Sequence, residues 1–371
     1  MQQVLFRIPI RIDGWLPNGI PIYGFGAMLF LTFLLVTWLA CRRAAKEGIS
    51  KEFMQDLAMW LFIGGIVGAR LSSVILEGVP LWQFFMIWDG GLILYGSIIG
   101  GLLTYLVFYF LVIRRRGISA WKLTDAAVPC FALGICLGRI GCLLNGCCYG
   151  SVACPDCPQI HFPFSSPARL VLVQEGLQTA AGFSMDDNAA DRRSVGAVDP
   201  NSPAARSGLQ AGDVIVQADG QPIASYKELQ DYLGRNWPRG KNDLALTVKR
   251  GPNEVNLPSF RPLTLGLHPT QLYESISMLL LFGLLLAYYP FRRNPGELAG
   301  IVMAGYGIHR YLNELLRADP RPIGFERYIS VILVGLGVAL WIWRRYMQPA
   351  SSASVAPPSH LAARSLAGTS R

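Results

Sequence analysis

The chain has 371 residues, of which 52% are hydrophobic and 15% are charged, with a formal net charge of +9 and a mean hydropathy of +0.35. This composition is too apolar for an ordinary soluble domain of that length. An integral membrane protein is the class that fits.

Apolar runs of about 20 residues, the length that crosses the hydrocarbon core of a bilayer, occur seven times along the chain. They cover roughly 20–40, 56–76, 92–113, 125–144, 272–290, 297–316 and 326–346. The first run has no basic leader directly before it and no small-residue cleavage site after it, so it is interpreted as a span and not as a signal peptide. The predicted fold class is therefore an all-α polytopic membrane protein with about seven transmembrane helices.

Lysine and arginine gather in the short segments that follow alternate spans. These residues are Arg42, Arg43, Lys46 and Lys51, then Arg114, Arg115, Arg116 and Lys122, then Arg292 and Arg293, and finally Arg344 and Arg345. The positive-inside rule makes this side cytoplasmic. We therefore expect the N-terminus outside, the C-terminus inside, and the segment from about 151 to 267 on the outer side. The net charge is explained by topology and by contact with anionic lipid, with no indication of a nucleic-acid partner.

Other arginines lie toward the outer ends of spans two, four and six, where positive charge does not help topology. They are Arg70, Arg139, Arg310 and Arg317. An arginine within a span is costly and usually marks a site. Neutralisation by Glu274 and Glu314 in a packed polar knot is a purely structural alternative. The cations outnumber these carboxylates, which favours a bound anion such as a phospholipid head group.

Span six carries the clearest spacing of polar residues. Tyr306, Arg310, Glu314 and Arg317 recur at i, i+4, i+8 and i+11, so we expect them on one inward face of a helix. Two guanidinium groups on this face suit a phosphate, with Glu314 orienting one of them and Tyr306 donating a hydrogen bond.

The segment from 169 to 265 is a different kind of polypeptide. The run from Val195 to Ile215 (VGAVDPNSPAARSGLQAGDVI) predicts a strand, a short helix and a second strand; Asp219-Gly220 indicates a hairpin, Tyr226 to Leu233 a helix, and Leu244 to Val248 a strand. Over about 195–260 this pattern resembles a PDZ domain of the bacterial envelope type. The resemblance implies an exported protein or peptide as ligand, bound along a sheet edge. A rigid spacer without a ligand is the alternative.

Five of the eight cysteines crowd the outer side: Cys142, Cys147, Cys148, Cys154 and Cys157. In an oxidising envelope we expect one or two disulfides that join the 142–148 turn to the 154–157 hairpin. A four-thiolate zinc site and a reduced, packed set are the alternatives. Because Cys147-Cys148 is a poor ligand spacing and five thiols leave one over, we predict no metal and no cofactor.

Taken together, the membrane part resembles the prolipoprotein diacylglyceryl transferase family of seven-span bacterial inner-membrane enzymes. The family signature is matched by Gly138, Arg139, Gly141, Asn145, Gly146 and Gly150. Further matches are Ile22-Tyr23-Gly24, Gly68-Ala69-Arg70, the run His268-Pro269-Thr270-Gln271-Leu272-Tyr273-Glu274, and Tyr306-Gly307 with Arg310, Glu314 and Arg317. The resemblance covers about 5–168 and 266–346.

This resemblance implies transfer of the diacylglyceryl group of phosphatidylglycerol to the lipobox cysteine of a prolipoprotein, which forms a thioether and releases glycerol-1-phosphate. Negative charge grows on the leaving phosphate and needs fixed cations, so Arg139 and Arg310 are the predicted catalytic residues together with Tyr95. The predicted substrate-binding residues are Arg139, Tyr23, Arg70, Asn145, Gly150, His268, Tyr273, Glu274, Tyr306, Glu314 and Arg317. The expected partners are phosphatidylglycerol and prolipoprotein signal peptides with a lipobox cysteine.

Three positions depart from the family pattern. Tyr95, in Leu94-Tyr95-Gly96, stands where many members have histidine, and Cys142 and Cys147 replace the asparagine and glutamate of the signature. A phenol with a pKa near 10 is poorly matched to proton transfer at neutral pH. A second function therefore stays open, that of a non-catalytic phosphatidylglycerol-binding envelope adaptor that recruits proteins through the PDZ-like module.

The predicted organisation has four parts. Residues 1–168 hold spans one to four and the first part of the outer loop, 169–265 form a periplasmic α+β insertion, 266–346 hold spans five to seven, and 347–371 are a disordered cytoplasmic tail rich in Ser, Ala and Pro. The expected location is the bacterial cytoplasmic (inner) membrane.

Overall fold

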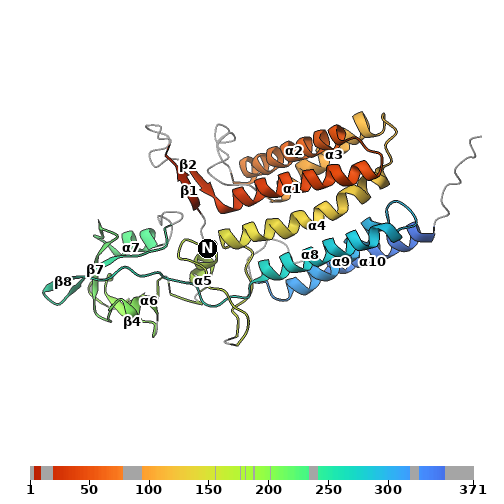
Figure 1. Cartoon of the computed structure of the whole chain (residues 1–371). Helices are drawn as coiled ribbons and strands as arrows, with labels where there is room; N and C mark the ends of the chain where they lie inside the picture. Colours follow the sequence, from red (N-terminus) through yellow and green to blue (C-terminus); the bar gives the residue numbers. More distant parts are fainter. Residues whose placement is uncertain are drawn as a thin grey trace, which may run out of the picture.

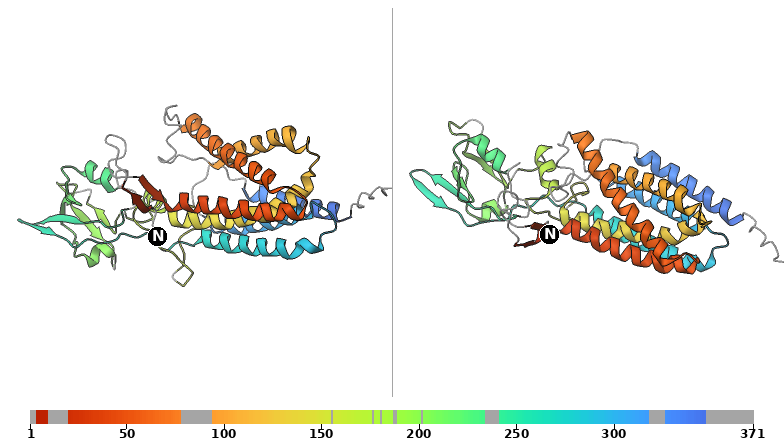
Figure 2. Two further views of the ribbon diagram at one scale, coloured as in Figure 1. Left: turned by 45° about the horizontal axis from the view of Figure 1, so that its top comes forward. Right: turned by 90° about the horizontal axis from the view of Figure 1, so that it is seen from above.

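The computed structural model describes residues 4–9, 20–77, 94–154, 156–175, 177–179, 181–186, 189–200, 202–233, 241–317 and 326–346. Long helices run together as a bundle, and a smaller unit with strands projects from one end of it (Figures 1 and 2). The predicted tail at 347–371 lies outside the described residues.

The bundle is built from long helices (Figure 1). Its helices are α1 (Gly24–Lys46), α2 (Lys51–Glu77), α3 (Leu94–Phe108) with the π-helical turn η3 (Tyr109–Ile113), α4 (Ala120–Asn145), α8 (Thr270–Tyr288) with the 3₁₀ turn η4 (Tyr289–Phe291), α9 (Glu297–Glu314) and α10 (Glu326–Tyr346).

Six helices of the described chain are long and apolar enough to cross a membrane. They are Gly24–Lys46, Lys51–Leu76, Gly96–Ile113, Ala120–Asn145, Thr270–Phe291 and Arg327–Tyr346. The predicted span at 297–316 forms α9, which is not among the six, because its 18 residues include Glu297, Arg310 and Glu314. The polytopic membrane fold is confirmed, and a seventh span remains a prediction.

The start of the first predicted span differs from the structure. Residues Ile20–Tyr23 form strand β2, which pairs in antiparallel fashion with β1 (Val4–Ile8), and the helix begins only at Gly24. The hairpin stands at the same end of the bundle as the smaller unit (Figure 1). Backbone pairing with β1 therefore overrides the continuous apolar run at this point.

Charged residues close the opposite end of the bundle. Arg292 forms ion pairs with Glu47 and with Asp125, the latter at 2.9 Å from Nη1 to Oδ2, and the backbone N–H of Gly296 also donates to Asp125. The Arg43 guanidinium lies 4.4 Å from the ring centre of Tyr289. Basic segments predicted on one side of the membrane therefore meet in space.

The inserted unit, residues 181–260, packs around one hydrophobic core, to which Phe164 of the preceding segment also contributes. A two-stranded pair, β3 (Phe183–Met185) and β4 (Val195–Val198), accompanies an antiparallel sheet in the order β6 (Gln221–Pro222), β5 (Val214–Ala218), β7 (Leu246–Arg250) and β8 (Asn253–Asn256), with helices α6 (Pro203–Arg206) and α7 (Tyr226–Leu233). Ile215, Leu229 and Val248 are buried in this core.

Local signals in this unit are confirmed. Asp219 and Gly220 both have positive φ, 52° and 78°, as the predicted hairpin requires. The predicted helix at 226–233 coincides with α7, and the strands expected at 195–198 and 244–248 coincide with β4 and, in its later part, with β7.

Glycines allow α2 and α3 to pack with their backbones in contact. A Cβ atom placed on Gly68 would lie 2.3 Å from the carbonyl oxygen of Gly96, and one on Gly100 would lie 2.3 Å from that of Gly64. Small residues at such crossings are typical of helix pairs in membranes, because close approach increases van der Waals contact.

We predict that Gly100→Ala lowers the unfolding midpoint of the purified protein in detergent, with a cost of about 1–3 kcal/mol for overpacking. Gly101→Ala is the matched control, because a Cβ atom there meets nothing within 4 Å. Equal midpoints for the two variants would show that α2 and α3 do not pack as described.

Candidate functional site

An ion pair inside the bundle forms the centre of the candidate site. Nη2 of Arg139 on α4 lies 2.9 Å from Oε1 of Glu274 on α8, and the two side chains are 18% and 1% exposed. Arg139 lies in the last turns of α4, which ends at the left-handed Gly146 (φ 74°), and Glu274 lies in the first turns of α8. The two helices therefore bring the charges together at the end of the bundle that carries the inserted unit (Figure 1).

Helix α9 completes the surroundings of Glu274. Nδ2 of Asn313 donates a hydrogen bond of 3.0 Å to Oε2 of Glu274, and Nε2 of His309 lies 3.9 Å from the same oxygen. The rings of Tyr306 and His309 are 6.4 Å apart. His309 and Asn313 were not predicted as site residues, although their spacing from Tyr306 at i+3 and i+7 marks one helix face.

The structure brings part of the predicted set on α9 together. Arg310 pairs with Glu314, as expected, at 3.2 Å between Nη2 and Oε2, and the Tyr306 ring lies beside His309. Helix α9 ends at Glu314, so Arg317 lies beyond the helix. Nη1 of Arg310 is buried without a hydrogen-bond partner among the described residues. Arg310 thus keeps donor capacity for a ligand.

Backbone pairing ties the turn after α4 to the segments before α8 and after α9. The N–H of Gly150 donates to the carbonyl oxygen of His268 at 3.0 Å, and Gly150 also forms a β-bridge with Arg317. A Cβ atom on Gly150 would lie 2.7 Å from Cβ of His268. The glycine is required for this close approach. Oη of Tyr273 lies 3.5 Å from Nδ1 of His268.

The remaining predicted residues have defined places in the fold. Tyr23 precedes α1, Arg70 is buried in α2, and Asn145 is the last residue of α4. Tyr95 lies in the first turn of α3, and its side chain is outside the described part of the chain. Their roles stay predictions.

The cysteines are not joined as expected. Cys154 and Cys157 form a disulfide with each other, so the bridge closes the hairpin and does not tie it to the turn after α4. Cys142, Cys147 and Cys148 are free, and their three sulfur atoms lie within 4.8 Å of one another. We call these three residues the cysteine cluster.

The cysteine cluster lies in a positive environment. Hydrogen bonds with the Cys142 and Cys147 thiols, and then the positive charges of Arg139 and Arg317, lower the pKa of the Cys148 thiol, although its burial acts in the other direction. The cluster is thus joined electrostatically to the ion pair at the centre of the site.

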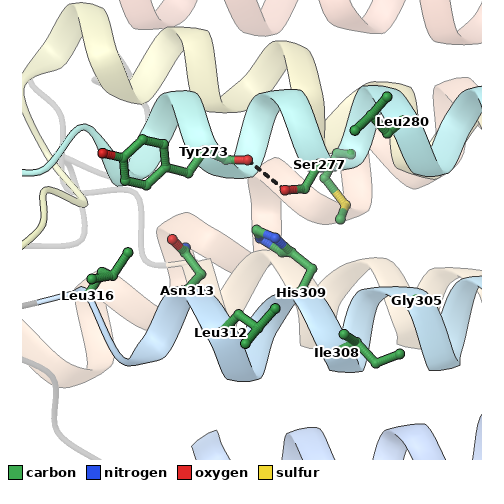
Figure 3. Close-up of a pocket in the computed structure, with 10 residues that line it drawn as sticks. Tyr273, Ser277, Leu280, Gly305, Ile308, His309, Leu312, Asn313 and Leu316 are labelled. Carbon is green, nitrogen blue, oxygen red and sulfur yellow. Dashed lines mark hydrogen bonds between the residues drawn. The ribbon is translucent and has the colours of Figure 1, made fainter. Parts of the chain in front are cut away.

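A pocket of about 430 Å³ opens between α8 and α9 beside this centre. His309 and Asn313 point from α9 toward α8, and Leu280, Ile308 and Leu312 line the apolar part (Figure 3). Nε2 of His309 and Oδ1 of Asn313 are buried without hydrogen-bond partners among the described residues. Such a pocket suits an amphipathic ligand, with an apolar chain and a polar end.

Comparison with known proteins identifies related sequences over most of the chain. The family model for prolipoprotein diacylglyceryl transferase matches residues 15–343. A phosphatidylglycerol–prolipoprotein diacylglyceryl transferase from Rhodopirellula baltica is 27% identical over 88% of this chain and 74% of its own length. The enzyme of that name from Clostridium tetani is 24% identical over 86% of this chain and 92% of its own length.

More local similarities were also found. The phosphatidylglycerol–prolipoprotein diacylglyceryl transferase of Thermus thermophilus is 42% identical over 33% of this chain and 44% of its own length. The solved PDZ domain of HtrA3, bound to a phage-derived ligand, is 26% identical over 24% of this chain and 86% of that domain, with a TM-score of 0.19. A TM-score this low does not establish a shared fold.

We predict that Glu274→Ala lowers the unfolding midpoint of the purified protein strongly, because it leaves the largely enclosed Arg139 without its carboxylate, at a cost of about 3–5 kcal/mol. Glu314→Ala is the control, since its partner Arg310 belongs to the same helix and pairs within a single turn have smaller effects. Equal losses in thermal unfolding would contradict a central role for the Arg139–Glu274 pair.

Proposed function

This chain belongs to the prolipoprotein diacylglyceryl transferase family, and from that premise we propose which of its residues carry out the transfer. The protein is a multi-pass membrane transferase that moves the diacylglyceryl group of phosphatidylglycerol to prolipoproteins. The observation that carries the assignment of the site is the set of Arg139, Glu274 and Asn313, contributed by three helices, in which the partly exposed Arg139 pairs with a buried carboxylate.

The reaction determines which groups the site must provide. The lipobox sulfur attacks the glyceryl carbon, the bond from that carbon to the phosphate oxygen breaks, and glycerol-1-phosphate leaves with the electron pair. Negative charge increases on the phosphate as the bond breaks. Cations already held in place stabilise this change most, because they need no reorganisation during the reaction.

Arg139 is suited to this role by its neighbours. Glu274 binds Nη2 of Arg139, which fixes the guanidinium plane and leaves further N–H groups for the phosphate. Asn313 holds the other oxygen of Glu274 and so fixes the carboxylate. We assign the phosphate to Arg139 and Arg310, with Arg317, Glu314 and the remaining predicted residues orienting or binding the lipid.

The pocket between α8 and α9 fits the lipid part of the substrate. Its apolar wall is formed by leucine and isoleucine side chains, and its polar side by His309 and Asn313 next to Glu274. An acyl chain along the apolar wall would place the glyceryl carbons near the cations. We propose this pocket as part of the phosphatidylglycerol site.

Topology and location are further parts of the proposal. We propose the inner membrane, with the N-terminus and the inserted unit outside the cytoplasm and the C-terminus inside. The meeting of Arg43 and Arg292 at the end of the bundle opposite the inserted unit supports this orientation.

The inserted unit is proposed to be a PDZ-like module that recruits exported proteins by binding an extended peptide. A compact core, an antiparallel sheet and the helix α7 support this reading. The substitutions at Tyr95, Cys142 and Cys147 favour a second function, a phosphatidylglycerol-binding adaptor without catalysis. Lipoprotein maturation in a strain depleted of its own transferase distinguishes the two functions, since an adaptor would not restore it.

We expect Arg139→Ala and Arg310→Ala each to reduce diacylglyceryl transfer to a lipobox peptide by at least about tenfold, because each removes charge-assisted contacts worth about 1.5–3 kcal/mol. Thioether formation by purified variants of matched folding is the measurement. Arg115→Ala serves as control, since Arg115 is exposed in the turn between η3 and α4. Normal transfer by Arg139→Ala would refute the phosphate assignment.

Contacts at the two ends of the insertion support a position at which the unit can be removed. The N–H of Leu265 donates to Oε1 of Gln178 at 2.9 Å, so the two ends of the insertion are adjacent. Helix α5 (Pro167–Gln174) contributes Leu172 to the cluster that contains Phe162 and Leu267, and should be kept.

Deletion of 179–262 with a short linker is therefore expected to leave transfer to a lipobox peptide unchanged, since the loop ends already meet. Transfer to full-length prolipoproteins should fall, because recruitment raises their local concentration without changing the chemistry. The rates for peptide and protein substrates are compared. Equal retention of both would reduce the unit to a spacer.

A further inference from the structure

The cysteine cluster is the group of reactive side chains that the proposed mechanism does not yet use. Cys142 lies in the last turn of α4, and Cys147 and Cys148 follow the left-handed Gly146. Their sulfur atoms lie within 4.8 Å of one another. Cys154 and Cys157 form a disulfide with each other and are not available as ligands. Three free thiols therefore converge on one point beside Arg139.

In place of the metal-free arrangement expected from the sequence, we propose that Cys142, Cys147 and Cys148 bind one zinc ion. The open fourth position of this ion takes the thiolate of the lipobox cysteine. The proposal rests on the transferase function and adds a metal site to it. Catalytic zinc sites have three protein ligands and one position for water or substrate. Three converging thiols match that number.

The geometry suits a tetrahedral ion. With Zn–S bonds of about 2.3 Å, tetrahedral ligands are separated by about 3.8 Å, which small side-chain rotations reach from the observed spacing. Adjacent cysteines are a poor ligand pair on a regular helix or strand. Cys148, however, has φ of 59°, so the backbone turns in the left-handed region between the two side chains and brings both thiols to one side.

The surroundings hold these ligands in place. Nε2 of Gln271 donates a hydrogen bond of 2.7 Å to the carbonyl oxygen of Cys147. Oγ1 of Thr270 donates a hydrogen bond of 2.8 Å to the carbonyl oxygen of Cys148. Both donors belong to the start of α8, next to Glu274. Fixed backbone carbonyls restrict the loop, as the outer contacts of metal ligands usually do.

The charges also match. Zinc with three thiolates carries one net negative charge, and the substrate thiolate adds a second. Arg139 and Arg317 are the cations that interact with Cys148. They would offset this charge and lie where the phosphate of the lipid is also proposed to bind.

The step is balanced without a further reactant. The lipobox thiol binds zinc as thiolate, since metal coordination deprotonates a thiol, and its proton passes to water. The thiolate sulfur then attacks the glyceryl carbon, the carbon–oxygen bond breaks, and the phosphate monoester leaves. The neutral thioether is a weak ligand and dissociates. Zinc would thus deprotonate the substrate thiol, the task for which Tyr95 is poorly suited.

The first test measures metal on the full-length protein, purified in detergent under reducing conditions. About one zinc per chain is expected for the parent, and Cys142→Ser, Cys147→Ser and Cys148→Ser should each lose most of it. Cys130→Ser is the control, because Cys130 is a free cysteine buried in α4 whose thiol donates to the carbonyl oxygen of Ala126 and is not part of the cluster. A parent protein that binds no zinc under these conditions would overturn the proposal.

The second test follows the substrate. In cobalt-substituted protein, a lipobox peptide should shift the ligand-field absorption bands, whereas the same peptide with serine in place of cysteine should not. Removal of zinc from the parent by a chelator should slow transfer by at least about a hundredfold, the usual contribution of a general base, and zinc should restore it. This measurement needs no variant that might misfold.

The zinc site and the transferase function would be overturned by different results. Full-rate transfer by reduced, zinc-free protein would overturn the zinc site and leave the transferase function intact. A zinc-loaded protein that binds the peptide thiol and never forms thioether would overturn the transferase function and leave the site.

Discussion

The whole arrangement depends on the cost of keeping the guanidinium of Arg139 inside a membrane helix bundle. A charge in this environment must be paired, and Glu274 provides the pair from a different helix. Glu274 in turn requires a donor, which Asn313 provides from a third helix. The contacts of Arg139, Glu274 and Asn313 thus link α4, α8 and α9 at the candidate site.

A second constraint is the junction between the turn after α4 and the start of α8. Gly150 contacts the backbone of His268, and Thr270 and Gln271 hold the carbonyl groups of the two preceding cysteines. This junction joins segments separated by more than a hundred residues of sequence. The backbone of Cys147 and Cys148 is therefore positioned by α8 as well as by the end of α4.

Sequence reasoning located what depends on composition and local spacing. The long apolar runs became helices, and Arg139 and Glu274 were found because charges in such runs are rare and costly. It missed His309 and Asn313, since α9 can be divided into polar faces in two ways and only packing against α8 selects one. The cysteine pairing was wrong for a similar reason. The left-handed φ of Cys148, which brings its thiol beside Cys142 and Cys147, is a property of the turn that residue types do not reveal.

The hydrogen bond between Gln178 and Leu265 has a consequence for how such a protein changes over time. Because the two ends of the insertion are held together by the part of the chain that stays with the bundle, the length and fold of the sequence between them contribute little to loop closure. A different folded domain could therefore be inserted between Gln178 and Leu265 without changing the membrane part. Under the proposed recruiting role of the inserted unit, such an exchange would change the range of substrates without changing the transfer chemistry.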